Sequence, residues 1–331
     1  MHEQTNDIYS STEDLLSSSS IEFILLLIIE ILSLSFTLVI LTFLLYHWKS
    51  LIRKAVRNHV IFILIIISLI YLIFDLPFTI NSYRLGYDQP RNTSFCIWWY
   101  WIDYTLIIIS IFLTAAASLQ RHILIFHAHW LHSHRARVLF HYLPIAICMI
   151  YPIVFYLSAI IFYPCQHSSN ETDEYYCSEP CYTNDLKLFN FDWIFNTGVP
   201  LMMILFGNVI LIFRVIRSMK KTRRRQSLIW RRQRKLALQL FALSSLFFFG
   251  WAPSTIISIL QSFRYSNLLD DYPQLNYLNY LTYFVCPLQT FTCLLGIPEF
   301  MKSITKHFRR IHSFNHTGPV RTIQNTLTLM R

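Results

Sequence analysis

Three acidic residues stand inside stretches that are otherwise almost entirely apolar: Glu30, Asp75 and Asp103. Ionisable groups in such a setting are costly and tend to be functional. Trp99 precedes Asp103 by four residues, so the two share a face on a helix. A carboxylate beside aromatic rings suits an ammonium or guanidinium group, through ion pairing and cation–π attraction. The alternatives are an aspartate hydrogen-bonded near the surface for Asp103, a helix-capping role beside Pro77 for Asp75, which we favour, and a bundle-facing polar contact for Glu30.

No catalytic motif accompanies these acids. The sequence holds neither a glycine-rich phosphate loop nor a His-Glu-x-x-His pair. Six histidines crowd one basic segment: His122, His127, His129, His132, His134 and His141. Because their spacing is irregular, we predict a solvated loop in preference to a metal site. We therefore expect a protein that is not an enzyme and that has no metal and no cofactor.

The elements that hold the acids are long apolar runs. The 331 residues are 54% hydrophobic and 14% charged, with a mean hydropathy of +0.41, whereas soluble domains carry about 25% charged residues. A membrane-spanning helix needs about 20 apolar residues. Seven stretches meet this requirement: residues 22–46, 59–82, 97–120, 139–163, 191–215, 236–262 and 275–296. Their apolar character is continuous, without the alternation of a β-barrel. The sequence predicts an all-α membrane protein, a bundle of seven transmembrane helices.

Basic and acidic residues fall in different loops between the apolar stretches. Of 28 Lys and Arg residues, 24 lie in four segments on one side: residues 47–58, 121–138, 214–235 and 299–331. Positive loops stay in the cytoplasm, so we expect an extracellular N-terminal tail (1–21), a membrane domain (22–297) and a cytoplasmic C-terminal segment (298–331). Residues 1–20 lack the basic start of a signal peptide, so we expect the first span to direct insertion. The basic runs are interpreted as topology signals and contacts with anionic lipid, and nucleic-acid binding is excluded.

The outer loops and tail carry twelve acidic residues against four basic ones. A negative vestibule of this kind raises the local concentration of cations. Two sequence patterns for N-glycosylation, at Asn92 and Asn170, fall on the same side. Four cysteines also lie there: Cys96, Cys165, Cys177 and Cys181. Four cysteines allow three pairings, of which we prefer Cys96–Cys181 with Cys165–Cys177.

Two residues of the third span show a characteristic separation. Arg121, in Leu119-Gln120-Arg121-His122, follows Cys96 by 25 residues. At about 1.5 Å per residue this is roughly 37 Å, enough to cross the bilayer. The separation resembles that of the rhodopsin-like (class A) G-protein-coupled receptors. In that family the cysteine is joined to the second extracellular loop, and the arginine lies at the cytoplasmic end. For Arg121 alone, the alternative is a positive-inside anchor.

The sixth span strengthens the resemblance. Its segment from Phe247 through Trp251 to Pro253 is similar to the family's Phe-x-x-x-Cys-Trp-x-Pro, with Gly250 in place of the cysteine. Proline removes a backbone hydrogen bond and bends the helix. The resemblance implies that Trp251 packs at the bend and that ligand contact rotates the inner half of the helix; a kink with a core tryptophan is the alternative. Pro200 matches the family's proline in the fifth span.

Several positions depart from the family's pattern. Gln120 replaces the acid beside the arginine, and Ser68 stands where a sodium-binding aspartate falls. In the seventh span, either Cys286-Pro287 or the segment 289–293 takes the place of Asn-Pro-x-x-Tyr, and neither register restores the asparagine or the tyrosine. These losses suggest a divergent, invertebrate-type receptor. Residues 299–311 match the family's short amphipathic eighth helix on the inner membrane face.

The resemblance implies a plasma-membrane receptor that binds an extracellular ligand and activates a heterotrimeric G protein. Because the outer face is acidic, we expect a cationic peptide, or else an amine, at Asp103. The expected ligand-binding residues are Asp103, Trp99, Tyr104, Asp192, Asn196, Trp251, Thr255, Tyr280 and Tyr283. The expected activation residues are Arg121, Phe247, Trp251 and Pro253. A transporter or a non-signalling membrane protein is the alternative, although no paired repeats typical of transporters occur.

The departures at the inner end generate a first prediction. Gln120 and Gln233 cannot form the acid–arginine contact that holds some receptors inactive, so we expect appreciable signalling without ligand. Second-messenger levels in cells expressing the chain, compared with untransfected cells, measure this activity. Silence in all the major G-protein pathways would contradict it.

Overall fold

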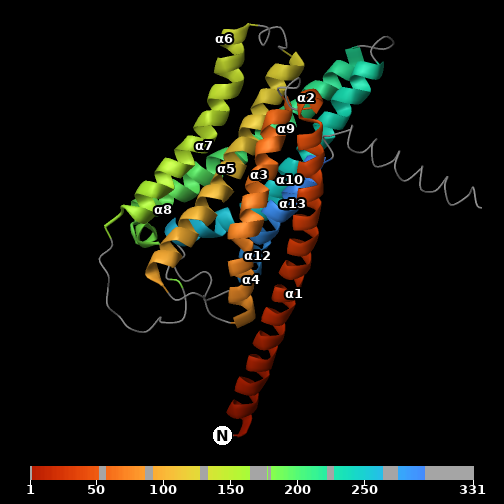
Figure 1. The fold of residues 1–331 in the computed structure, drawn as a ribbon. Helices are drawn as coiled ribbons and strands as arrows, with labels where there is room; N and C mark the ends of the chain where they lie inside the picture. Colours follow the sequence, from red (N-terminus) through yellow and green to blue (C-terminus); the bar gives the residue numbers. More distant parts are fainter. Residues whose placement is uncertain are drawn as a thin grey trace, which may run out of the picture.

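The computed structural model describes residues 2–51, 57–85, 92–126, 133–164, 177, 180–221, 227–263 and 275–294. The helices form an elongated bundle, from which the first helix projects beyond its neighbours at the N-terminal end (Figure 1). Within the described part of the chain, six helical spans are long and apolar enough to cross a membrane. Helices satisfy their own backbone hydrogen bonds, which hydrocarbon requires. The first six predicted spans are thereby confirmed.

The first, third and sixth spans are single helices: α1 (His2–Tyr46), α5 (Thr93–Phe126) and α10 (Ser227–Phe263). The second consists of α3 (Arg57–Phe74) and α4 (Leu76–Leu85). The fourth consists of α6 (His134–Arg137), η2 (Val138–Tyr142), α7 (Leu143–Tyr156) and η3 (Leu157–Ile161). The fifth consists of α8 (Leu186–Phe191), η5 (Asp192–Gly198) and α9 (Val199–Lys221). The short elements α2 (Trp48–Leu51) and η4 (Cys181–Asn184) lie between spans.

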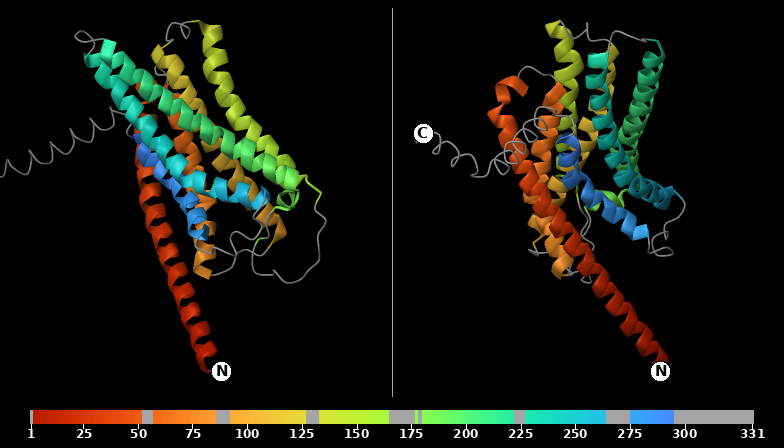
Figure 2. Two further views of the ribbon diagram at one scale, coloured as in Figure 1. Left: turned by 180° about the vertical axis from the view of Figure 1, so that it is seen from behind. Right: turned by 90° about the vertical axis from the view of Figure 1, so that its right-hand side faces the viewer.

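The seventh predicted stretch is helical in three pieces: α12 (Asn276–Tyr280), η7 (Leu281–Phe284) and α13 (Val285–Leu294). The inner piece, α13, contacts α1, α3 and α10 and packs along the first helix in both views of Figure 2. The predicted eighth helix and the tail beyond it lie outside the described residues.

The third helix occupies the centre of the bundle. It contacts α3, α7, α9 and α10, and its buried residues Ile108, Ile111 and Leu113 belong to the main hydrophobic core. The elements α2 and α6, which belong to the basic segments 47–58 and 121–138, lie at one end of the bundle, opposite the N-terminus (Figure 1). The arrangement therefore places two basic segments together, as the charge pattern predicts.

Prolines interrupt the helices where the sequence predicts bends. Pro77 has no N–H to donate one turn back, and the second helix divides at Asp75 into α3 and α4. The carbonyl oxygen of Asp75 accepts from the backbone nitrogens of Phe78 (3.1 Å) and Thr79 (3.2 Å), which restarts the helix. Pro200 follows the wide π-helical turn η5, and Pro253 lies within α10.

The fifth helix begins at a capping aspartate. The side chain of Asp185 accepts hydrogen bonds from the backbone N–H groups of Lys187 (2.9 Å) and Leu188 (3.4 Å). Side-chain oxygens at this position satisfy donors that a helix start leaves unpaired. The bond from Lys187 lowers the pKa of Asp185, because it stabilises the ionised carboxylate.

The sixth and seventh helices approach closely at Gly250. A Cβ atom added there would lie 2.2 Å from Cγ2 of Val285 and 3.8 Å from the carbonyl oxygen of Leu281. Val285 is itself buried, at 1% exposure. The glycine, which departs from the family's cysteine, thus makes room for a branched side chain on the facing helix.

We predict that Gly250→Ala lowers the free energy of unfolding by about 1–3 kcal/mol, the usual cost of overpacking. The double variant Gly250→Ala/Val285→Ala should regain most of this loss, because the new methyl group occupies the space that the valine vacates. Thermal unfolding of the purified variants, with Val285→Ala as the control, measures the coupling. Additive losses in the double variant would show that the two side chains do not compete for the space.

Candidate functional site

The two outer acids of the bundle lie close together. Asp75, at the break of the second helix, is 1% exposed. Its Oδ1 accepts a hydrogen bond of 2.7 Å from the indole nitrogen of Trp99 on the third helix. Asp103, one turn further along that helix, lies within electrostatic range of Asp75. The sequence predicted the partnership of Trp99 with Asp103, whereas the hydrogen bond goes to Asp75.

Each acid keeps an unused oxygen. Oδ2 of Asp75 and Oδ1 of Asp103 are buried and have no hydrogen-bond partner within the described part of the chain. Such groups are expensive in an apolar interior unless a partner is supplied. Two adjacent carboxyl groups also repel one another when both are ionised. The pair, which we call the acid pair, therefore has the chemistry of a cation-binding site.

The two predicted tyrosines of the seventh helix differ in their surroundings. Tyr283 lies within electrostatic range of both aspartates. Tyr280 is directed elsewhere, since its hydroxyl donates to the carbonyl oxygen of Glu22 on the first helix, at 2.6 Å. Tyr83 contacts both rings edge-on, at 5.7 and 6.2 Å between centroids. An aromatic wall thus joins the outer ends of the first, second and seventh helices.

A third buried acid belongs to a separate cluster. Asp192 of the fifth helix accepts hydrogen bonds from the hydroxyls of Tyr156 (2.6 Å) and Tyr182 (2.8 Å) and from the amide of Asn196 (2.7 Å). Asn196 in turn accepts from the hydroxyl of Tyr151, at 2.7 Å. The predicted ligand-binding residues Asp192 and Asn196 therefore connect the fourth helix, the fifth helix and η4.

The third helix separates the two clusters. Tyr104 follows Asp103 directly, yet its ring lies 5.5 Å from that of Tyr156 and 6.4 Å from that of Tyr182. Because successive residues of a helix point about 100° apart, Asp103 faces Asp75 and Tyr104 faces the cluster around Asp192. We expected all of these residues in one ligand site, and the structure divides them between two faces of the third helix.

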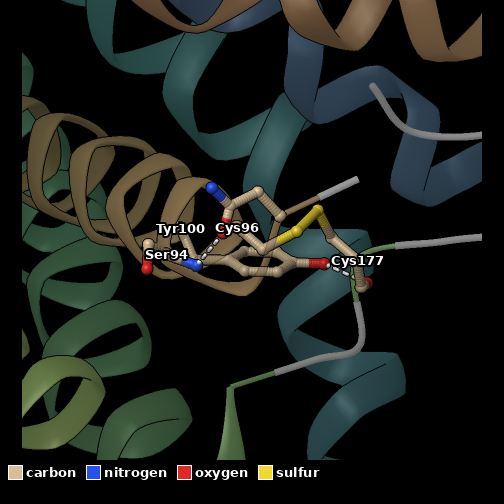
Figure 3. The surroundings of a disulfide bond; sticks show 5 residues. Ser94, Cys96, Tyr100 and Cys177 are labelled. Atoms are coloured by element: carbon tan, nitrogen blue, oxygen red, sulfur yellow. Dashed lines mark hydrogen bonds between the residues drawn. A yellow bond between two sulfur atoms is a disulfide. The ribbon is translucent and has the colours of Figure 1, made fainter. Parts of the chain in front are cut away.

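A disulfide bond closes the outer end of the third helix, and its pairing corrects our preference. Cys96 is bonded to Cys177, with Cα atoms 5.6 Å apart, and not to Cys181. Because Cys177 is taken by this bond, the predicted Cys165–Cys177 pair is wrong as well. The hydroxyl of Tyr100, one turn after Cys96, donates to the carbonyl oxygen of Cys177 at 2.9 Å (Figure 3). Tyr100 therefore holds Cys177 over the third helix.

The position of Cys181 is fixed by the next residue in the chain, Tyr182. Cys181 begins η4, whose next residue, Tyr182, is buried and bound to Asp192 of the fifth helix. Cys181 is also disulfide-bonded, while Cys165 and the predicted glycosylation site Asn170 lie outside the described residues. Asn92 is exposed, and its side chain accepts from the backbone nitrogen of Ser94 at 3.1 Å where the third helix begins (Figure 3).

At the inner end, Gln120 takes part in a chain of hydrogen bonds. Its Oε1 lies 3.1 Å from Nδ1 of His141, and Nε2 of His141 lies 3.1 Å from Nδ1 of His59. His141 is 2% exposed, which corrects its predicted place in a solvated histidine loop. The correction has a physical reason, because η2 turns the imidazole toward the third helix, where Gln120 and His59 satisfy both ring nitrogens. Arg121 lies in α5, and its side chain is outside the described part.

The centre of the bundle carries a neutral network where the family has a sodium-binding aspartate. Ser68 donates to the carbonyl oxygen of Cys286 at 2.8 Å and lies 3.0 Å from the hydroxyl of Thr290. Thr290 also accepts from Thr37 of the first helix at 3.2 Å, and Gln289 donates to the carbonyl of Leu64 at 2.8 Å. Both sequence registers of the seventh helix thus contribute to this contact.

The sixth helix places its predicted residues around the proline bend. Phe247 is fully buried and Trp251 is 9% exposed, both within the main core. The hydroxyl of Thr255 donates to the carbonyl oxygen of Trp251 at 2.8 Å, across Pro253. Thr255 thus adds a side-chain hydrogen bond to the helix backbone beside the bend, while the indole N–H of Trp251 has no partner among the described residues.

Comparison with protein-family models identifies the class. The model of the 7 transmembrane receptor (rhodopsin family) matches residues 26–295, and the chain belongs to this family. Comparison with curated proteins gave no match. The match spans all seven predicted helices except a few terminal residues, and it supports a membrane receptor over the transporter alternative.

The role of Trp99 generates a prediction. Trp99→Phe keeps an aromatic ring but leaves Oδ1 of the buried Asp75 without its donor, a loss that costs about 1–3 kcal/mol. The melting temperature of the purified variant should fall accordingly. Trp98→Phe is the matched control, because Trp98 is 37% exposed on the same helix. Equal melting temperatures for the two variants would show that the Trp99 hydrogen bond does not stabilise the fold.

Proposed function

We propose that the chain is a plasma-membrane receptor with an extracellular N-terminus, that a cationic ligand binds at the acid pair, and that the ligand-bound form activates a heterotrimeric G protein. The observation that carries the ligand class is the pair of buried aspartates, each with an unused oxygen. Membership of the rhodopsin family supports a signalling receptor in general.

The contrast with Asp192 supports this assignment. Three donors already satisfy Asp192. In the acid pair, Trp99 and Tyr71 interact with Asp75 only, and Oδ1 of Asp103 has no partner among the described residues. A ligand ammonium or guanidinium group supplies both the missing hydrogen bonds and the missing charge. Tyr283 adds a ring beside the pair, which favours a cation further.

The outer surface supports a basic peptide as the ligand more than a small amine. Twelve acidic residues in the outer loops and tail attract positive charge over a wide area, and the acid pair binds one cationic group of the peptide. The fifth helix directs Asp192 and Asn196 into their own network. Ligand contacts beyond the acid pair therefore fall to the second, third and seventh helices.

Coupling to a G protein is proposed for the inner end, around Arg121. In this proposal, ligand contact at the third and seventh helices moves Trp251 and the inner half of the sixth helix, where Pro253 weakens the backbone bonding. The residue before Arg121 is the neutral Gln120, which contacts His141, so Arg121 has no acid beside it in the sequence.

The test is a second-messenger screen with libraries of basic peptides and amines. For a cationic agonist found in this way, Asp103→Asn should reduce potency at least about tenfold, since a hydrogen-bonded charge is worth about 1.5–3 kcal/mol. Asp185→Asn is the matched control, because it removes the same charge from the outer side and asparagine caps a helix as well as aspartate. Unchanged potency in Asp103→Asn, at equal surface expression, would reject the acid pair as the ligand site.

A further inference from the structure

A groove lies between the fifth and sixth helices, apart from the acid pair. Its cavity volume is about 840 Å³, and it reaches inward to Leu119 of the third helix. Met202 and Phe206 of α9 and Ile256 of α10 line it, and these side chains are 47–57% exposed on transmembrane helices. The groove therefore opens toward the hydrocarbon of the bilayer. We call it the helix 5–6 groove.

Its walls suit a hydrocarbon chain. Apart from Arg214 at one end, Thr255 is the only lining residue with a polar side-chain group, and its hydroxyl already donates to Trp251. Sixteen residues separate the lining positions Gly198 and Arg214, a rise of about 24 Å. Half of a hydrocarbon core is about 15 Å, so the groove accommodates a chain that runs from the inner interface past the midplane.

Arg214 distinguishes the inner end. It is the first of eleven basic residues between positions 214 and 235, a segment without an acid. Its guanidinium suits a phosphate group, which it can bind with two parallel hydrogen bonds. The cytoplasmic leaflet is the leaflet that carries anionic lipids. The groove thus has a positive charge at its inner end and apolar walls beyond it. This order matches the headgroup and the acyl chains of an anionic phospholipid.

We propose that the helix 5–6 groove binds one anionic glycerophospholipid of the inner leaflet, with an acyl chain in the groove and its headgroup phosphate at Arg214. The lining residues Phe248 and Ala252 precede Pro253, and Ile256 follows it. The bound chain consequently contacts both halves of the bent sixth helix and the facing fifth helix. The lipid stabilises the arrangement of the two helices that the structure shows.

The experiment uses the full chain purified from nanodiscs of phosphatidylcholine mixed with phosphatidylserine, and native mass spectrometry counts the retained lipid. The wild-type chain should retain phosphatidylserine in preference to phosphatidylcholine. Arg214→Ala should reduce this preference about tenfold, because it removes a hydrogen bond to a charged group, and this bond is stronger to the net negative headgroup of phosphatidylserine than to phosphatidylcholine, whose ammonium offsets the phosphate charge. Lys49→Ala is the control, because it removes an exposed charge near the inner end of the first helix.

A second variant tests the acyl chain. Ala252→Phe fills the groove and should reduce the retention of both lipids severalfold, whereas Ala146→Phe, the same change at an exposed position of α7, should not. Equal retention by these two variants, equal preference in Arg214→Ala and Lys49→Ala, or no preference in the wild-type chain would each overturn the proposal. If Ala252→Phe does not fold, the comparison of Arg214→Ala with Lys49→Ala decides.

Discussion

In the hydrocarbon interior of a membrane, a polar side chain finds partners only within the protein or in what the protein binds. This constraint explains the polar clusters of the bundle. Asp192 has three donors, and Ser68, Thr290 and Thr37 form a continuous network. The acid pair differs, because each aspartate has an oxygen that no described residue satisfies. The same residue type is therefore fully hydrogen-bonded at Asp192, whereas Asp75 and Asp103 each keep one oxygen without a partner among the described residues.

The helices and their order follow from the sequence, since apolar length and charge sorting depend on local composition alone. The separation of Cys96 from Arg121 correctly identified the third helix. The proximity of Asp75 to Asp103 could not be predicted, because it depends on how the second helix resumes after Pro77. Likewise, nothing in the sequence indicates that Asp192 meets Tyr156 and Tyr182, which come from two other elements.

The two corrections share a cause. We preferred Cys181 as the partner of Cys96 and predicted that His141 lies in a solvated loop. In the structure, hydrogen bonds to specific neighbours hold Cys177 and His141 in place. Tyr100 holds Cys177 against the third helix, and Gln120 and His59 enclose His141. Tertiary hydrogen bonds of this kind leave no periodic signal in a sequence.

The contact among Gln120, His141 and His59 has a defined polarity. The amide nitrogen of Gln120 donates to the carbonyl oxygen of His141, so its oxygen accepts from Nδ1–H of the same residue. Nε2 of His141 then accepts from Nδ1–H of His59. One chain of hydrogen bonds thus joins the inner ends of the second, third and fourth helices.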